Sequence, residues 1–179
     1  LQHSQDHQKP NSVDIPYWVF GGLGYAAMCG GFYRYNNDVD IMVLDEDFKD
    51  FESILDDICK ENDWRICKTF LRSVRPKNEI FINKHEIMSV VPVYKTDSSV
   101  KFVSNEGDKE YPSDILTKQD RCLGGFVFPT PRDEFLYNLL FDYLSSKKNY
   151  PNPEKRREDA RHILSEKDFK KFFPDFPYR

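Results

Sequence analysis

Apolar and polar residues alternate along the chain in patterns that predict short strands and amphipathic helices. Residues 17–20, a run of Tyr, Trp, Val and Phe, are typical of a short buried strand. Residues 45–62 carry apolar side chains on one stripe and acids or lysines on the other face, which predicts an amphipathic helix. Further strands are predicted over residues 38–44, 64–70, 79–83, 85–94, 100–103 and 125–128, with a turn at Asn83-Lys84 and a loop over 105–108.

The C-terminal part of the chain is predicted to be helical. Apolar residues between Phe135 and Leu144 repeat at helical spacing, and we expect Thr130 to cap this helix with Pro131 at its first position. Two more helices are expected over 152–164 and 166–173. Strands and helices in alternation, followed by helices alone, predict an α/β (α+β) fold with a mixed β-sheet flanked by helices and a short helical C-terminal part.

Length and composition limit the class of protein. A chain of 179 residues fits one domain, which we divide into a flexible lead-in over 1–13, a core over 14–130 and a helical region over 131–179 packed on that core. No apolar run approaches the roughly 20 residues that span a bilayer, and no signal peptide is visible, so we expect a cytoplasmic protein without a membrane partner. Four cysteines without CxxC spacing (Cys29, Cys59, Cys67 and Cys122) predict free thiols.

Two carboxylates stand at the start of one predicted strand, beside a glycine turn. Asp38 and Asp40 are two residues apart, so their side chains project from the same strand face. Mg²⁺ prefers one or two carboxylates together with substrate phosphates. Gly21-Gly22 leads into a predicted helix start over 23–28, where free backbone N–H groups attract phosphate. These segments together predict a nucleotide site, and a surface hairpin with incidental acids is the alternative.

This stretch resembles the signature of the DNA polymerase β-like nucleotidyltransferase superfamily. Within it, the stretch is most similar to the small antibiotic- and toxin-type enzymes, the aminoglycoside, lincosamide and minimal nucleotidyltransferases. The residues that match the signature are Gly21, Gly22, Gly24, Ala27, Gly30, Arg34, Asp38 and Asp40. The resemblance implies a nucleotidyltransferase core over 14–130 that uses Mg²⁺ to move a nucleoside monophosphate from an NTP to an acceptor hydroxyl. The acceptor stays open among a small molecule such as an antibiotic, a tRNA and a protein, and toxin-type members imply an antitoxin-like partner.

The resemblance also implies roles for single residues. Asp38 and Asp40 would be catalytic and hold the metal, while Gly21, Gly22 and Arg34 would contact the nucleotide. Two later residues, Ser89 and Lys155, would join the nucleotide site. Lys155 and Asp159 match a late Lys-Asp-x-x-Asp element of the family, and an ion pair on a helix surface explains the same two residues.

One position departs from the family pattern. The enzymes carry a third carboxylate, a general base, on a later strand three residues before a proline, and here that residue is Ser89 before Pro92. Glu86 is the candidate replacement as a catalytic carboxylate, although it faces away from residue 89 unless a bulge intervenes. Glu79 on the paired strand is a second candidate. The departure supports an alternative function, a catalytically impaired nucleotide-binding or interaction module on the same fold.

Overall fold

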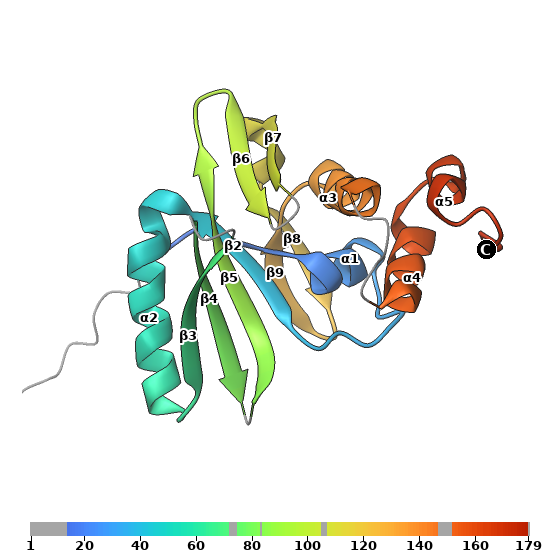
Figure 1. Ribbon diagram of the computed structural model, residues 1–179. Helices are drawn as coiled ribbons and strands as arrows, with labels where there is room; N and C mark the ends of the chain where they lie inside the picture. Colours follow the sequence, from blue (N-terminus) through green and yellow to red (C-terminus); the bar gives the residue numbers. More distant parts are fainter. Residues whose placement is uncertain (1–13, 72–74, 83, 105–106, 147–151, 179) are drawn as a thin grey trace, which may run out of the picture.

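The computed structural model describes residues 14–178 except 72–74, 83, 105–106 and 147–151. Within this part of the chain the central sheet follows the order β1-β2-β5-β4-β3, and β6 and β7 extend it from β5 (Figure 1). Among the described strands, only β2 and β5 pair in parallel. The strands are β1 (Tyr17–Phe20), β2 (Val39–Leu44), β3 (Arg65–Leu71), β4 (Arg75–Ile82), β5 (His85–Lys95), β6 (Ser99–Ser104) and β7 (Gly107–Pro112).

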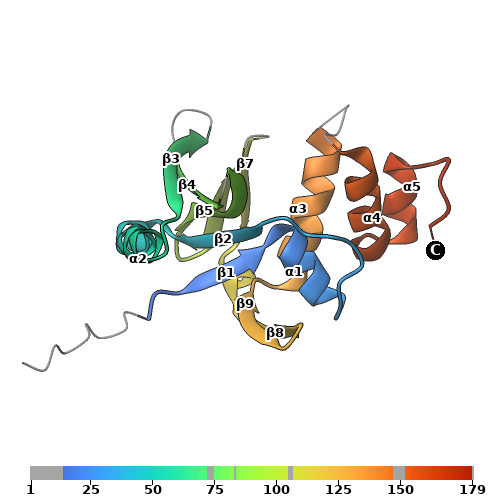
Figure 2. The same cartoon turned by 90° about the horizontal axis from the view of Figure 1, so that it is seen from below.

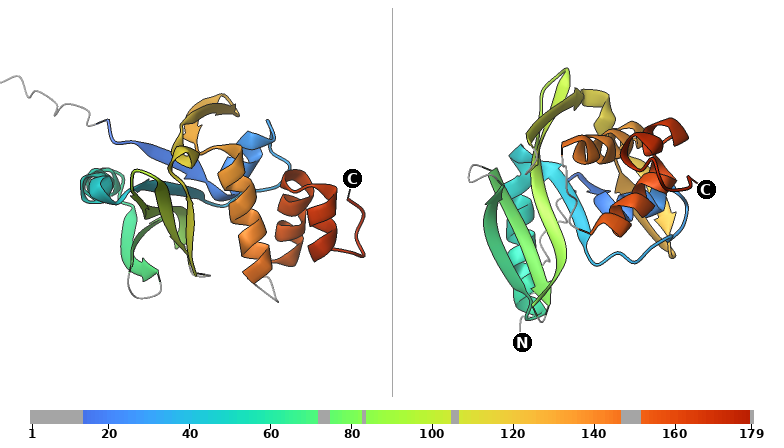
Figure 3. Two further views of the ribbon diagram at one scale, coloured as in Figure 1. Left: turned by 90° about the horizontal axis from the view of Figure 1, so that it is seen from above. Right: turned by 45° about the vertical axis from the view of Figure 1, so that its right-hand side comes forward.

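Helices cover both faces of this sheet. One face packs against α2, and α1 and α3 lie on the other side (Figure 2). Figure 3 shows α3, α4 and α5 side by side, with α3 nearest the sheet. The helices are α1 (Gly21–Met28), α2 (Phe48–Glu61, after a 3-10 turn at Asp45–Asp47), α3 (Asp133–Ser146), α4 (Pro153–Ile163) and α5 (Glu166–Phe172); a separate hairpin holds β8 (Gln119–Leu123) and β9 (Phe126–Thr130). A mixed sheet flanked by helices confirms the predicted fold class.

Strand alternation divides the core into two layers. Ile41 and Val43 of β2 pack with α2, whereas Met42 between them packs with the C-terminal helices. Successive side chains of a strand point to opposite faces, so Asp40 shares the face of Met42. The acid of β2 is therefore directed into the layer between the sheet and the C-terminal helices.

Several predicted boundaries are corrected by the structure. Thr130 does not cap a helix: it ends β9, its hydroxyl donates to the Gln119 carbonyl at 3.2 Å, and α3 begins at Asp133. β7 occupies residues predicted as loop at 107–108, while 105–106 lie outside the described residues. β8 was not predicted. β7 and β8 both carry polar residues at most positions, and their buried apolar side chains are Tyr111 and Leu123. The hydrophobic pattern of these two strands is therefore weak.

Other expectations concern the chain ends, the thiols and the helix starts. The predicted lead-in over 1–13 and Asn83 of the predicted turn lie outside the described residues. Asn152, the first residue of the helix expected over 152–164, caps α4 by accepting the Lys155 backbone N–H. All four cysteines are free thiols. Among the described residues, every helix is too short or too polar to cross a membrane.

Candidate active site

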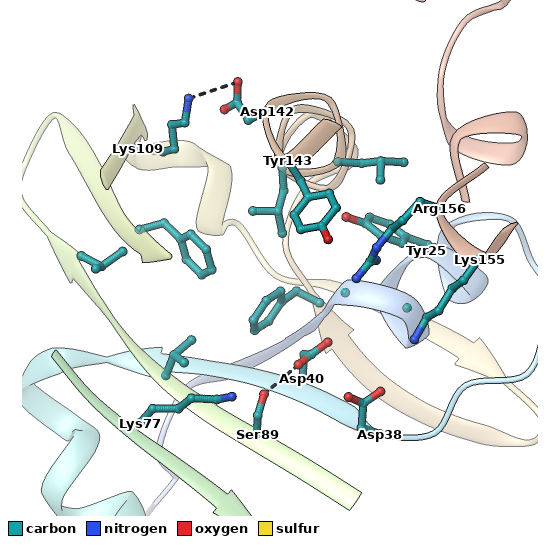
Figure 4. Close-up of a pocket in the computed structure, with 18 residues that line it drawn as sticks. Tyr25, Asp38, Asp40, Lys77, Ser89, Lys109, Asp142, Tyr143, Lys155 and Arg156 are labelled. Atoms are coloured by element: carbon teal, nitrogen blue, oxygen red, sulfur yellow. Dashed lines mark hydrogen bonds and ion pairs between the residues drawn. The ribbon is translucent and has the colours of Figure 1, made fainter. Parts of the chain in front are cut away.

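Asp38 and Asp40 line one cavity of about 360 Å³ between the sheet and the C-terminal helices (Figure 4). Asp40 lies within β2, and Asp38 lies just before its first residue. The remaining walls come from β1, α1, β4, β5, β6, β7, α3 and α4. They are Phe20, Gly21, Gly22, Tyr25, Lys77, Ser89, Val91, Phe102, Val103, Lys109, Leu139, Leu140, Asp142, Tyr143, Lys155 and Arg156. Segments far apart in the sequence therefore meet at the two acids.

The glycine turn lies directly against Asp40. Phe20 pairs with Asp40 across β1 and β2, and α1 starts at the next residue. Gly21 has a φ of +60°, and a Cβ at this position would lie 2.1 Å from Oδ2 of Asp40. Only glycine satisfies both the left-handed backbone and the close approach. No side chain caps α1, so the first N–H groups of the helix remain available to an anion in the cavity.

Gly22 also allows two segments of the protein to pack closely together. A Cβ there would lie 2.4 Å from Oδ1 of Asn36 and 2.7 Å from Nη2 of Arg34. The missing side chain thus lets the loop before β2 pack against the start of α1. The glycine lines the cavity, but the space it leaves open is filled by the protein itself.

Ser89 takes its place beside Asp40 through strand pairing. The parallel register of β2 and β5 sets Asp40 opposite Ser89, and the Ser89 hydroxyl donates to Oδ1 of Asp40 at 2.7 Å. Burial raises the pKa of the Asp40 carboxyl, and the nearby Asp38 adds to the rise; the Ser89 hydrogen bond and the charges of Lys77 and Lys155 oppose it. A cation at the two acids would relieve this unfavourable burial of charge.

A bulge in β5 brings Glu86 to the face of Ser89. Met88 pairs with Ile80 and Glu86 pairs with Phe81, so Ile87 is an extra residue in β5. This extra residue is the bulge that Glu86 needs in order to share a strand face with Ser89. Burial first, and then the neighbouring acids, raise the pKa of the Glu86 carboxyl. The side chain is 34% exposed and does not line the cavity.

Lys77 enters the cavity from β4, where no strand was predicted at that residue. Its ammonium lies 2.7 Å from Oε1 of Glu79 and 3.9 Å from Oε1 of Glu86. Glu79 pairs with Ser89 across β4 and β5. Both glutamates that sequence analysis offered as replacements for the third acid are thus held by one lysine.

Arg34 lies outside the cavity and holds two segments together. Its guanidinium donates to both carboxylate oxygens of Asp159 on α4, at 2.5 and 3.0 Å, and to Oδ1 of Asn36. Asp159 is fully buried and also accepts the Tyr33 hydroxyl at 3.0 Å. Arg156 adds an ion pair at 3.5 Å. This cluster fixes α4 relative to the loop that precedes β2.

The start of α4 supplies cations to the cavity. Figure 4 shows Lys155 extending past the beginning of α1 toward Asp38. Among the described residues, no carboxylate pairs with the Lys155 ammonium at ion-pair distance. The Arg156 guanidinium lies over the Tyr143 ring at 4.5 Å. The predicted surface ion pair between Lys155 and Asp159 does not form, because Asp159 faces Arg34.

The far end of the cavity combines apolar walls with one neutral ion pair. Lys109 of β7 lies 3.5 Å from Oδ1 of Asp142 on α3, and the Tyr111 hydroxyl donates to Oδ2 at 3.2 Å. Phe102 and Leu139 supply apolar surface. Neither this end of the cavity nor Lys77 was predicted from the sequence. Charged residues at alternate positions 75, 77 and 79 were the signal available for β4, whereas the consecutive charges at 108–110 gave no such pattern for β7.

Comparison with known proteins gives one family match and several solved structures with a similar fold. The family model described as aminoglycoside-2''-adenylyltransferase matches residues 7–129. No curated protein sequence matches significantly. The fold is similar to that of the lincosamide antibiotic adenylyltransferase LnuA in its lincomycin-bound crystal structure. The TM-score is 0.57 at 19% identity, and the match covers 84% of this chain and 87% of that chain.

A second solved structure is similar to the same extent. It is ANT(2'')-Ia in complex with adenylyl-2''-tobramycin, with a TM-score of 0.57 at 15% identity. The match covers 91% of this chain and 90% of that chain. A solution structure of ANT(2'')-Ia gives a TM-score of 0.56 at 14% identity, with 88% and 80% covered. At these identities the two proteins show the fold that this chain adopts.

Proposed function

We propose that this chain, which belongs to the aminoglycoside-2''-adenylyltransferase family and is therefore a nucleotidyltransferase, uses Mg²⁺ to move an adenylyl group from ATP to a hydroxyl of a small molecule. One observation carries the proposal. Asp38 and Asp40 share a cavity with the uncapped start of α1 and with Lys155. Two carboxylates suit a divalent cation, and helix N–H groups and a lysine suit phosphates.

The acids fit a cation that arrives with a nucleotide. Among the described residues, no group of three or more His, Cys, Asp or Glu side chains could hold a metal ion. Mg²⁺ is commonly bound by one or two carboxylates and completes its shell with substrate phosphates and water. Asp38 and Asp40 supply that number. When bound, the ion neutralises phosphate charge and orients the triphosphate.

The chain's own residues then position the reaction. The N–H groups of α1 and the side chains of Lys155 and Arg156 bind phosphate oxygens, and the walls of the cavity hold the acceptor hydroxyl in line. The hydroxyl oxygen forms a bond to the α-phosphorus while the bond from that phosphorus to the α,β-bridging oxygen breaks. Pyrophosphate leaves, and the hydroxyl proton passes to a carboxylate. Glu86 is the proposed base: the bulge at Ile87 turns it to the face of Ser89, so that it takes the proton of an acceptor at the edge of the cavity, which its own side chain does not line.

The far end of the cavity indicates the chemistry of the acceptor. Asp142 is the acid at this end, and Lys109 and the Tyr111 hydroxyl already occupy both of its oxygens. No uncompensated carboxylate therefore faces this part of the cavity among its described lining residues. A polycationic acceptor lacks partners here, whereas Phe102 and Leu139 suit an apolar face. The proposed acceptor is a hydroxylated small molecule with an apolar face and at most one or two amines.

Ser89 supports a second candidate, nucleotide binding without turnover. Its hydroxyl occupies Oδ1 of Asp40 and cannot act as a base at neutral pH. The module would bind Mg²⁺ and ATP through the same acids and α1 turn. It differs from the enzyme in releasing ATP unchanged.

Label transfer from α-labelled ATP tests the proposal. The acceptor panel contains a lincosamide, an aminoglycoside, tRNA and a protein pool, each assayed with Mg²⁺ and with EDTA. More label is expected on the lincosamide than on the polycationic aminoglycoside. Asp40→Asn should abolish the label transfer, whereas Asp45→Asn, on the turn before α2, should leave it unchanged. Transfer that persists in Asp40→Asn would refute the site. Absence of transfer with intact ATP binding would favour the second candidate.

A further inference from the structure

The site has two carboxylates, Asp38 and Asp40, which suffice for one divalent cation. Where a second cation would need a further carboxylate, the site has a lysine, Lys77. Two-metal sites that flank a transferred phosphoryl group need carboxylates around both ions. Here the strand beside Asp40 presents Ser89 in the position of the third acid. The described residues contain no other cluster of metal-ligating side chains. The chain therefore fits one Mg²⁺ better than two.

Lys77 reaches the space beside Ser89. Glu79 pairs with Ser89 across β4 and β5, and Lys77 lies two residues earlier on the same face of β4. The side chain is 20% exposed and lines the cavity. Figure 4 shows it extending along the sheet toward Ser89 and Asp40. Its position places a positive charge on the side of Asp40 opposite to Lys155.

Glu79 and Glu86 hold the Lys77 ammonium in place but leave some of its N–H donors without a hydrogen bond. An ammonium has three N–H donors. One donates to Oε1 of Glu79 at 2.7 Å, and Glu86 at 3.9 Å is within ion-pair distance but beyond hydrogen-bond distance. Two donors are left for an oxygen in the cavity.

We propose that Lys77 takes the place of the second divalent cation, so that the nucleotide complex holds one Mg²⁺ and the Lys77 ammonium contacts an α-phosphate oxygen on the Ser89 side. This assignment rests on the proposed function. Glu79 and Glu86 anchor the ammonium, as carboxylates would anchor an ion. A fixed cation at the α-phosphate stabilises charge that develops there without having to be recruited from solution.

The count of bound cations tests the assignment on the unaltered protein. The chain is dialysed against Mn²⁺ and α,β-methylene-ATP, and bound Mn²⁺ is counted by electron paramagnetic resonance. We expect one Mn²⁺ and one nucleotide per chain. Two Mn²⁺ per chain would overturn the role of Lys77 and leave the proposed function standing, whereas a chain that binds neither Mn²⁺ nor the nucleotide overturns both.

Variants test the residue itself. Lys77→Met should weaken binding of Mn²⁺·α,β-methylene-ATP by more than about tenfold, which is roughly 1.4 kcal/mol, and Lys77→Arg should retain most of the affinity because it keeps the charge. Lys101→Met, which removes an exposed lysine paired with Asp108 on β6 and β7, is the matched control and should not change it. In Lys77→Met combined with Ser89→Asp, a second Mn²⁺ should bind. Unchanged affinity in Lys77→Met would show that the lysine only pairs with Glu79.

Discussion

Replacing Gly21 with alanine should destabilise the protein more than replacing any glycine that has open space around it. The left-handed backbone at Gly21 costs an L-residue about 1–2 kcal/mol. The new Cβ would also lie 2.1 Å from Oδ2 of Asp40, so the buried carboxylate has to move. Loss of its hydrogen bond from Ser89 adds about 1.5–3 kcal/mol, because the acceptor is charged. The free energy of unfolding should fall by about 2.5–5 kcal/mol in total.

Two other glycines separate these contributions. Gly30 has a φ of +75° with nothing within 4 Å of an added Cβ, so Gly30→Ala carries the backbone cost alone, about 1–2 kcal/mol. Gly31→Ala meets neither problem and should stay within about 0.5 kcal/mol of the parent. Urea denaturation of the three variants gives each value. Equal losses in Gly21→Ala and Gly30→Ala would refute the close approach to Asp40.

Three further variants test the buried cluster, the base and the C-terminal helices. Asp159→Ala leaves Arg34 without its buried partner and should lower the free energy of unfolding by about 3–5 kcal/mol in urea; a loss below about 1 kcal/mol would contradict the cluster. Glu86→Gln should lower kcat by about 10²-fold or more with a much smaller loss of ATP affinity, because Glu79 still holds Lys77; an unchanged kcat removes Glu86 as the base. Hydrogen bonds from Lys171, Tyr137 and Ser165 lower the pKa of Asp168 to about 2 from its usual 3.8. Because that pKa is depressed, its stabilisation is present above pH 4 and is lost as the pH falls toward 2. Asp168→Asn should therefore lower Tm at pH 6 and converge with the parent at low pH; a constant difference would contradict this.

The acids and the glycine turn could be predicted because they are close in the sequence. Gly21, Asp38 and Asp40 fall within one strand-helix-strand segment, where a period of two and a helix start determine which way each side chain points. The family resemblance rested on this segment and the mixed fold on the order of strands and helices along the chain, and both are confirmed by the comparisons.

The rest of the site depends on pairings that the sequence does not display. Lys77 reaches the cavity because β4 pairs with β5 in a register that places Glu79 opposite Ser89. The face of Glu86 is decided by one extra residue, Ile87, which no local pattern reveals. The partner of Arg34 in the structure is the buried Asp159, 125 residues later, a pairing that no local pattern reveals.

The most direct test of the Asp38–Asp40 site is calorimetric titration with α,β-methylene-ATP in the presence and absence of Mg²⁺. The parent protein and Asp45→Asn should bind with the same, Mg²⁺-dependent affinity, because Asp45 lies on the turn before α2 and does not line the cavity. Asp38→Asn keeps the shape of the side chain and removes its charge, and it should weaken binding by more than about tenfold. Equal affinity in all three proteins, or binding that ignores Mg²⁺, would contradict the assignment of these acids.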